Sequence, residues 1–408
     1  MIPRHAASLL DRLLVYFPCT VISGVRQCGK TTLLETLPED WRRFDMERAV
    51  DRQQVLADPD LFLRLHPRRT AIDEAQLVPD LFPALRVAID RDRTARGCFV
   101  VTGSSSPDLV RRISESLAGR VGLLELSPLT MAEAWELPTS SVYTTLAHRE
   151  GVEALMAGAA ARLSIPQIFE YWFHGGYPEP WLSKDAEFRR LWHRSYLDTY
   201  LMRDIGYLFP NLNQDRYRQL IALLSQISGS IINKAEIART LGVSEPTVRD
   251  WLQIAHGTFL WRHLPAWDRS PSKQLVKHPK GFLRDTGLLH RLLRLTDVDQ
   301  LMTHPVMGRS WEGMVVETLL RGFENAGYDV APYHYRTRGG AEIDLILEGD
   351  FGLLPVEIKL SLPTDGRFLR ALHEFVVSHD CPVGLVITND DRPRRLDERI
   401  VAIPAGGL

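Results

Sequence analysis

One segment near the start of the chain constrains the fold more than any other feature: Val21-Ile-Ser-Gly-Val-Arg-Gln-Cys-Gly-Lys-Thr-Thr-Leu-Leu34. An apolar stretch typical of a strand leads into a loop between Gly24 and Gly29, and a helical pattern begins at Lys30. The loop satisfies the pattern G-x-x-x-x-G-K-[ST] in full. Backbone N–H groups that converge on phosphate oxygens require glycines where the chain curls tightly, and the helix directs its positive end at the same phosphates. The segment therefore predicts a strand, a phosphate-binding loop and a helix.

The residues that close this loop have separate expected roles. Lys30 would neutralise the β- and γ-phosphates of a nucleotide, and the Thr31 hydroxyl would ligate Mg²⁺. Gly24, Gly29 and Thr32 complete the expected phosphate-binding set. Only seven of the 49 lysine and arginine residues are lysines, so a lysine at position 30 carries extra weight. The alternative is a chance glycine turn before an ordinary helix, but a strand before the loop and a helix after it favour phosphate binding.

A pair of carboxylates, Asp73 and Glu74, ends the short apolar stretch 69–73. In a phosphate-loop site the first carboxylate, Asp73, would hold Mg²⁺, and Glu74 would polarise the attacking water. The carboxyl ends of parallel strands form the ligand edge of an open α/β sheet, so both residues would lie beside the loop. Taken alone, the pair would also suit an acidic helix start after a strand. Together with the loop upstream, it favours a hydrolytic site.

The next apolar stretch, 98–106, ends in a polar cluster at the same expected edge. Thr102, Ser104 or Ser105 would orient water or contact the γ-phosphate. The alternative is a serine N-cap for a helix over 107–116, and one serine would serve both purposes.

Strands that alternate with helices, each strand nearly continuous in apolar residues, indicate an α/β fold with a parallel sheet covered on both faces. The segments 24–32, 73–76, 102–105 and 117–120 resemble those of the AAA-type ATPases, and more narrowly a prokaryotic family of them with a further C-terminal domain. The resemblance implies a P-loop domain over residues 1–135, ATP and Mg²⁺ as cofactors, and ATP hydrolysis as the reaction. Cys28 stands where many members carry valine, which suggests that the loop is sensitive to thiol reagents.

Two arginines would stabilise charge in the transition state of such a reaction. Arg120 is either a surface arginine or a charge that meets the γ-phosphate, in its own chain or across a subunit interface. Residues 136–215 are expected to form a helical lid and connecting region, since 173–178 and 196–205 also resemble the family. That resemblance would place Arg203 near the nucleotide as a second sensor or finger, and the alternative is an Arg203–Asp204 pair that caps a structural helix.

Residues 216–280 change to a compact helical pattern that predicts a winged-helix domain. The stretches 234–241 and 245–252 flank a turn at Gly242, as in a helix-turn-helix, and Ser244 would cap the second helix. The stretches 259–264 and 274–276 would form a β-wing.

This region is one of two expected contacts with DNA. Residues expected to face DNA, in the groove or at its phosphates, are Glu245, Thr247, Arg249, Lys273, Lys277, His278 and Lys280. The alternative is an internal packing module, since Glu245 and Asp250 place negative charge on the reading helix.

Residues 281–408 predict a second constellation on a small α/β core. The expected order is a helix over 311–320, strands over 333–336, 342–348 and 354–360, a helix over 367–377 and a strand over 383–388. With Asp344, Glu357 and Lys359, this order resembles the core of restriction-endonuclease-like, PD-(D/E)xK domains.

The spacing of these residues would suit a metal-dependent nuclease. Alternation puts Glu357 and Lys359 on one strand face, where Glu357 and Asp344 would share Mg²⁺ and Lys359 would assist the attacking water. Glu317 would supply a further ligand from the helix, with Glu312 as the other choice. The alternative is a salt-bridged strand pair in a module that binds a partner, because a fold does not fix a function.

Composition limits the wider class of the protein. The 408 residues, 45% hydrophobic and 25% charged with a net charge near −2, suit two or three globular domains and give no overall attraction to nucleic acid or membrane. Four cysteines without a C-x-x-C pair indicate neither a disulfide framework nor a zinc site. The sequence has neither a signal-peptide pattern nor an apolar run of membrane-spanning length, so we expect a cytoplasmic protein without a membrane partner.

Three overall functions follow from these patterns. The first is an ATPase that acts on nucleic acid through residues 234–280 and the C-terminal domain. The second is a nucleotide-dependent switch that binds a protein partner or a second copy and carries an inactive nuclease-like domain. The third is a regulator that binds DNA.

Overall fold

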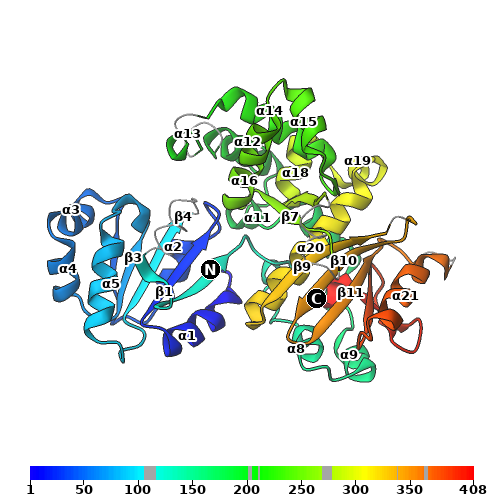
Figure 1. The fold of residues 1–408 in the computed structure, drawn as a ribbon, viewed down its shortest axis with the longest axis horizontal. Helices are drawn as coiled ribbons and strands as arrows, with labels where there is room; N and C mark the ends of the chain where they lie inside the picture. The colour runs from blue at the N-terminus through cyan, green and yellow to red at the C-terminus, as the bar shows by residue number, and fades with distance from the viewer. Residues whose placement is uncertain (105–115, 201–204, 210–211, 269–277, 338, 363–365) are drawn as a thin grey trace. The chain divides into compact units, whose positions relative to one another are not determined.

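The computed structural model describes the chain except for residues 105–115, 201–204, 210–211, 269–277, 338 and 363–365. The described parts form two compact units. Unit 1 comprises Met1–Leu129 with Gly257–Phe259, and unit 2 comprises Thr130–His256 and Leu260–Leu408 (Figure 1). The region expected to be the P-loop domain falls almost entirely in unit 1. Apart from Gly257–Phe259, the regions expected to be the lid, the winged helix and the C-terminal domain fall in unit 2.

Unit 1 is built on a five-stranded sheet in the order β2-β3-β4-β1-β5, with every neighbouring pair parallel. Its strands are β1 (Cys19–Gly24), β2 (Arg42–Asp45), β3 (Thr70–Asp73), β4 (Phe99–Ser104) and β5 (Val121–Leu126). Its helices are α1 (Ala6–Tyr16), α2 (Lys30–Glu35), α3 (Ala49–Ala57), α4 (Pro59–Leu65) and α5 (Leu81–Arg91), with a 3-10 turn at Ala75–Leu77. The predicted parallel sheet is therefore present, and β3 and β4 neighbour one another at its carboxyl edge.

The apolar strands and helices of unit 1 share one core. Helices α3, α4 and α5 contribute Val55, Phe62 and Leu85, which pack with Val21 and Ile72 of the sheet. Helix α1 contacts β1 and β5. The sheet is thus covered by helices, which is why its strands read as nearly continuous apolar runs.

Unit 2 begins with a run of short helices. These are α7 (Met131–Ala134), α8 (Ser141–Ala147), α9 (Val152–Gly158), α10 (Ile165–His174), α11 (Pro178–Leu182), α12 (Ala186–Thr199) and α13 (Ile205–Leu208). Several starts are fixed by local chemistry: Thr130 and Glu133 form a capping box at α7, and a proline opens both α10 and α11.

Three helices and a three-stranded antiparallel sheet follow, with strand order β6-β8-β7. The elements are α14 (Gln214–Ile227), β6 (Ser230–Ile231), α15 (Lys234–Leu241), α16 (Glu245–Gly257), β7 (Trp261–Leu264) and β8 (Lys280–Leu283). Gly242 takes the expected left-handed turn at φ 63°, and Ser244 Oγ accepts a hydrogen bond from Thr247 N at 3.2 Å. The strand expected at 274–276 lies outside the described residues, and the domain boundary expected after residue 280 falls within β8.

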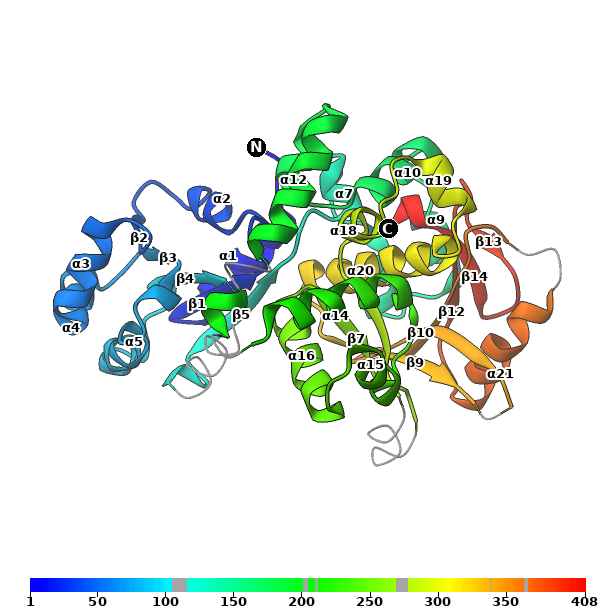
Figure 2. The same ribbon diagram turned by 90° about the horizontal axis from the view of Figure 1, so that it is seen from above.

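The last part of unit 2 pairs a long helix with a six-stranded mixed sheet of order β13-β14-β12-β11-β10-β9. Its helices are α18 (Thr286–Leu292), α19 (Val298–Thr303), α20 (Met307–Ala326) and α21 (Arg370–Ser378). Its strands are β9 (Val330–Arg336), β10 (Glu342–Gly349), β11 (Gly352–Ile358), β12 (Gly384–Thr388), β13 (Arg394–Arg395) and β14 (Ile400–Pro404). Helix α20, yellow in Figure 2, is buried along most of its length and contacts β9 and β11. Among the described helices, none combines the length and apolar character needed to cross a membrane.

Candidate functional site

The loop between β1 and α2 has the geometry that its glycines predict. A Cβ on Gly24 would lie 2.1 Å from the carbonyl oxygen of Leu126, so the chain passes too close to β5 for any other residue. Gly29 adopts φ 99° in the left-handed region directly before α2. The buried Lys30 donates from Nζ to the carbonyl oxygens of Gly24 and Val25, each at 3.2 Å. The ammonium group is thus held over the loop.

Asp73 connects the start of α2 to the end of β4. Thr31 Oγ1 donates to Asp73 Oδ2 at 2.6 Å, and Thr102 Oγ1 donates to Asp73 Oδ1. The main-chain N–H of Glu74 bonds to Thr102 Oγ1 at 3.2 Å and to Asp73 Oδ1 at 3.1 Å. The carboxylate is therefore surrounded by neutral hydroxyl and amide donors. A hydroxyl and a carboxylate are hard oxygen donors of the kind Mg²⁺ prefers, so Thr31 and Asp73 fit a magnesium nucleotide.

Glu74 lies at a turn in a conformation that side chains rarely adopt. Its φ of 52° is left-handed, and its carboxylate accepts a hydrogen bond from Gln76 Nε2. Such conformations cost on the order of 1–3 kcal/mol and concentrate at functional sites. The turn follows the carboxyl end of β3 and keeps the main chain of Glu74 beside Thr102. A residue that activates water is expected at this position.

Arg4 supports the loop, although no sequence pattern predicts a role for it. Its guanidinium donates to the carbonyl oxygens of Cys28 and Ser127, both at 2.6 Å, and so ties the loop to the segment after β5. The partners lie 24 and 123 residues away in sequence, so no local pattern could have identified this residue. Arg4 acts by positioning the loop.

The thiol of Cys28 is enclosed within the loop and its surroundings. The side chain is fully buried, and burial raises the pKa of the thiol. Thiol reagents attack the thiolate, so the expected sensitivity of the loop is not supported.

The remaining residues expected near the phosphates are not brought together by the described structure. Arg120 pairs with Asp90 instead, with Nε and Nη2 at 2.9 and 3.0 Å from its two carboxylate oxygens, and this pair lowers the pKa of Asp90. The side chain of Ser104, and all of Ser105 and Arg203, lie outside the described residues. Thr32 is half-buried in the first turn of α2.

The C-terminal sheet brings Asp344, Glu357 and Lys359 together. Lys359 Nζ lies 2.8 Å from Glu357 Oε2 and 3.1 Å from Asp344 Oδ2, which also accepts from Ile358 N at 2.8 Å. The register of β10 against β9 shifts between Ile343 and Ile346, so Asp344 lies at an irregularity of the strand. Such bulges re-aim side chains.

A second lysine enters this cluster from β8. Lys280 Nζ contacts Glu312 Oε1 of α20 and lies 3.9 Å from Asp344 Oδ1. Burial and the neighbouring Asp344 raise the pKa values of Glu312 and Glu357 to about 8 each. Burial would also raise the pKa of Asp344, but Lys359 and Lys280 outweigh it and lower that pKa. We call Lys280, Glu312, Asp344, Glu357 and Lys359 the acid–lysine cluster.

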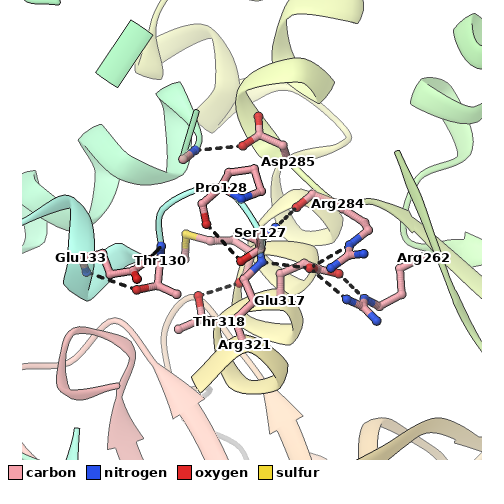
Figure 3. A network of polar contacts seen from close by, with 12 residues as sticks. Ser127, Pro128, Thr130, Glu133, Arg262, Arg284, Asp285, Glu317, Thr318 and Arg321 are labelled. Atoms are coloured by element: carbon pink, nitrogen blue, oxygen red, sulfur yellow. Dashed lines mark hydrogen bonds and ion pairs between the residues drawn. The ribbon is translucent and has the colours of Figure 1, made fainter. Parts of the chain in front are cut away.

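The assignment of Glu317 to this site requires correction. Glu317 is held instead by three arginines, with Arg262 on both carboxylate oxygens and Arg284 Nε and Arg321 Nε each 3.2 Å from Oε2 (Figure 3). Burial alone would raise the pKa of Glu317, but the three guanidinium groups hold it well below its usual range. The helix contributes Glu312 to the cluster and uses Glu317 as a structural anion.

The described residues show no ready-made metal centre. Across the described ranges, no group of three or more His, Cys, Asp or Glu side chains is arranged to hold a metal ion. In the acid–lysine cluster, ammonium groups lie where a cation would neutralise the carboxylates. At Asp73, by contrast, the phosphates of a nucleotide would complete the ligand set.

The expected DNA-facing residues of α16 are on its surface. Glu245 and Arg249 are exposed, and Arg249 Nε lies 3.4 Å from Asp250 Oδ1. Lys273 and Lys277 lie outside the described residues. Lys280 points instead to Glu312, so it belongs to the acid–lysine cluster and not to an open basic surface.

Comparison with known proteins finds family models that match three parts of the chain. A family model described as an AAA domain matches residues 16–135. Two models described as domains of unknown function, DUF8612 and DUF4143, match residues 165–299 and 307–408. The proteins Rv2008c of Mycobacterium tuberculosis and Mb2031c of Mycobacterium bovis are each 36% identical over 410 residues, covering 98% of this chain and 83% of theirs. The chain belongs to the family of these mycobacterial proteins.

This chain therefore carries a domain of the AAA type over residues 16–135. Among solved structures, the Walker-type ATPase PABY2304 of Pyrococcus abyssi matches with 15% identity and a TM-score of 0.41, covering 72% of this chain and 96% of its own. A RuvB variant of Thermotoga maritima matches with 16% identity and a TM-score of 0.29, covering 71% and 92%. The family model confirms the predicted resemblance to AAA-type ATPases for residues 16–135. The winged helix and the nuclease-like domain stay predictions.

Proposed function

We propose that the protein binds ATP with Mg²⁺ at the loop of residues 24–31 and hydrolyses it. The observation that carries this proposal is the link from Thr31 through Asp73 to Thr102. It joins the phosphate loop, the acidic strand end and the polar strand end into one network at the carboxyl edge of the sheet, where ligands of open α/β sheets bind.

Each residue then has a task. Lys30 would exchange its two carbonyl contacts for the β- and γ-phosphates, and Thr31 and Asp73 would hold Mg²⁺. The metal, when bound, supplies positive charge beside the phosphate oxygens. Glu74, held in its left-handed turn, would accept a proton from the attacking water. Arg203 stays a proposed second sensor or finger.

The test is the rate of phosphate release from ATP by the full-length protein. We expect Lys30→Ala to weaken nucleotide binding, and Glu74→Gln to keep binding while turnover falls about 10²- to 10⁴-fold, the usual contribution of a general base. Lys184→Ala is a matched control, since Lys184 is an exposed lysine outside the site. A wild-type rate no higher than that of Glu74→Gln would contradict hydrolysis.

A second function is favoured by unit 2: contact with nucleic acid through residues 234–280 and the C-terminal domain. The order helix, strand, helix, helix, strand, strand from α14 to β8 supports a winged helix, and the order from α20 to β12 supports a restriction-endonuclease-like core. Lys280 and Lys359 compensate the carboxylates of the acid–lysine cluster. We therefore propose nucleic-acid binding without cleavage, with ATP turnover coupled to it in the cytoplasm.

This second function is tested by adding single- and double-stranded DNA to the turnover assay. We expect the rate to rise with DNA, DNA to stay intact with Mg²⁺ or Mn²⁺, and Arg249→Ala to weaken binding. Cleavage that is lost in Asp344→Ala would show an active nuclease and overturn the second half of the proposal. If the ATP turnover rate does not change with DNA and the protein captures a protein partner or a second copy only with nucleotide, the result would favour the nucleotide-dependent switch.

A further inference from the structure

A pocket of about 340 Å³ lies within unit 2, among α10, α12 and α18. It is separate from the acid–lysine cluster and is lined by residues that the proposed function does not use. Its polar lining is mostly basic: His174, Arg189, Arg190, His193, His290 and Arg291. A volume of this size is in the range of small-ligand sites.

Most of these side chains already have partners. His290 bonds through Nδ1 to the Phe173 carbonyl oxygen at 3.0 Å and through Nε2 to Ser310 Oγ at 2.7 Å. Arg189 donates from Nε to the carbonyl oxygens of Pro180 and Ser183 at 3.0 and 2.7 Å. These residues build the wall of the pocket and keep its shape.

His193 differs from these residues, because only one of its two ring nitrogens has a hydrogen-bond partner within the described chain. Nδ1 donates to the Arg189 carbonyl oxygen at 2.8 Å, whereas Nε2 is buried and has no hydrogen-bond partner within the described chain. The residue is 5% exposed and lines the pocket. Leaving a buried polar atom unsatisfied costs about 1–3 kcal/mol, so an unsatisfied nitrogen in a residue of the pocket lining favours a ligand that reaches it when the side chain shifts.

Arg291 supplies charge without compensation. No ion pair joins it to a carboxylate in the ranges that the structure describes, and its neighbours Arg190, Arg194 and Arg294 add to burial in lowering its pKa. Glu187, the acidic residue on the lining, is exposed and lies 3.6 Å from Arg190. The lining therefore carries an excess of positive charge that an anion would relieve.

We propose that this pocket binds the phosphate group of a small phosphate ester, with Arg291 and Arg190 on the phosphate oxygens and His193 Nε2 on a hydroxyl of the ligand. Guanidinium groups bind phosphate through paired hydrogen bonds, which suits a cluster of arginines. A neutral His193 whose Nδ1 carries the proton presents Nε2 as an acceptor, which requires a donor on the ligand. The volume beyond the phosphate would hold the rest of the ester.

The proposal is tested by calorimetric titration of the full-length protein with glycerol 3-phosphate, after the P-loop has been filled with MgADP. We expect one site, at least tenfold weaker binding in Arg291→Ala, and partial recovery in Arg291→Lys. Arg336→Ala is the matched control, because Arg336 is an exposed arginine of unit 2 paired with Glu342 at 2.7 Å.

A DNA duplex added as competitor distinguishes the source of the phosphate. Displacement of glycerol 3-phosphate by the duplex, itself dependent on Arg291, would assign the pocket to a backbone phosphate, and a lack of displacement would assign it to a free ester. No saturable binding, or equal binding by wild type and Arg291→Ala, would overturn the proposal. A failure of ATP hydrolysis would leave this result unaffected, because the loss of binding in Arg291→Ala is measured without any turnover of ATP.

Discussion

The Asp73 site of unit 1 and the acid–lysine cluster of unit 2 use the same residue types in opposite ways. Both place carboxylates at strands and a lysine nearby. Asp73 accepts hydrogen bonds from the neutral hydroxyls of Thr31 and Thr102, while the ammonium group of Lys30 contacts carbonyl oxygens of its own loop. In unit 2, Lys359 and Lys280 contact the carboxylates directly.

The difference decides which site is prepared for a cation. Within the described residues, no ion pair compensates the Asp73 carboxylate, so its charge is available to a metal ion. A carboxylate beside a buried ammonium is already compensated, and removal of the ammonium would leave costly buried charge. Two motifs that both suggest Mg²⁺ in the sequence therefore differ in what they would do.

The largest expected effect concerns Glu317, a buried carboxylate of unit 2 whose charge is compensated by three arginines. Glu317→Gln would leave Arg262, Arg284 and Arg321 without their buried anion, and breaking such a pair costs about 3–5 kcal/mol. Asp73→Asn keeps a side chain that the hydroxyls can still contact, so we expect its cost to stay within about 1 kcal/mol. Urea unfolding followed by circular dichroism measures both.

A double variant separates lost pairing from lost packing. Arg284→Met in the Glu317→Gln background removes one of the three guanidinium groups that have lost the Glu317 carboxylate, and it should restore part of the stability. If Glu317→Gln lowers the free energy of unfolding by no more than Asp73→Asn does, charge compensation by nearby cations does not distinguish the two regions.

A smaller effect is expected in the pH dependence of stability. The pKa of Glu357 is raised to about 8 in the folded protein from the ordinary value of 4.5. Between these values the folded state binds more protons than the unfolded state, so the free energy of unfolding falls as the pH rises. The contribution is complete below about pH 4.5 and is lost by about pH 8, at no more than about 1.4 kcal/mol per pH unit.

Glu357→Gln isolates this effect, because the amide stays neutral throughout. Relative to wild type, the variant should gain stability from pH 5 to pH 8 in urea titrations. A difference that is constant over this range would mean that Glu357 is ionised in the folded protein from the start.

The sequence predicted the parts of the molecule that local patterns control. The loop of residues 24–31, the strand ending at Asp73 and the strands that carry Asp344 and Glu357 follow from glycine spacing and apolar runs, and all are present. Each of these features is encoded within a dozen residues. Contacts between segments that are distant in the sequence leave no local pattern of this kind.

The choice between Glu312 and Glu317 shows why the rest could not be predicted. Residues five positions apart on a helix point about 140° away from one another, so only one can face the strands of the cluster. Which one does so depends on how α20 packs against the sheet and on Lys280, which arrives from β8. Arg4 is a parallel case, since its two partners are carbonyl oxygens, which any residue could offer.

The smallest expected effect concerns Arg120 and decides whether the Asp73 site includes an arginine. An arginine finger contributes about 10³- to 10⁵-fold to turnover, whereas a partly exposed ion pair contributes little. Because Arg120 is engaged by Asp90 through two hydrogen bonds, we expect Arg120→Ala to leave the ATP turnover rate close to wild type and to match Asp90→Ala.

A loss of turnover by two orders of magnitude or more in Arg120→Ala but not in Asp90→Ala would show that Arg120 exchanges Asp90 for phosphate during the reaction. The Asp73 site would then resemble the acid–lysine cluster in one respect, since a nearby cation would help to balance its charge, but it would gain that cation only when the nucleotide is bound.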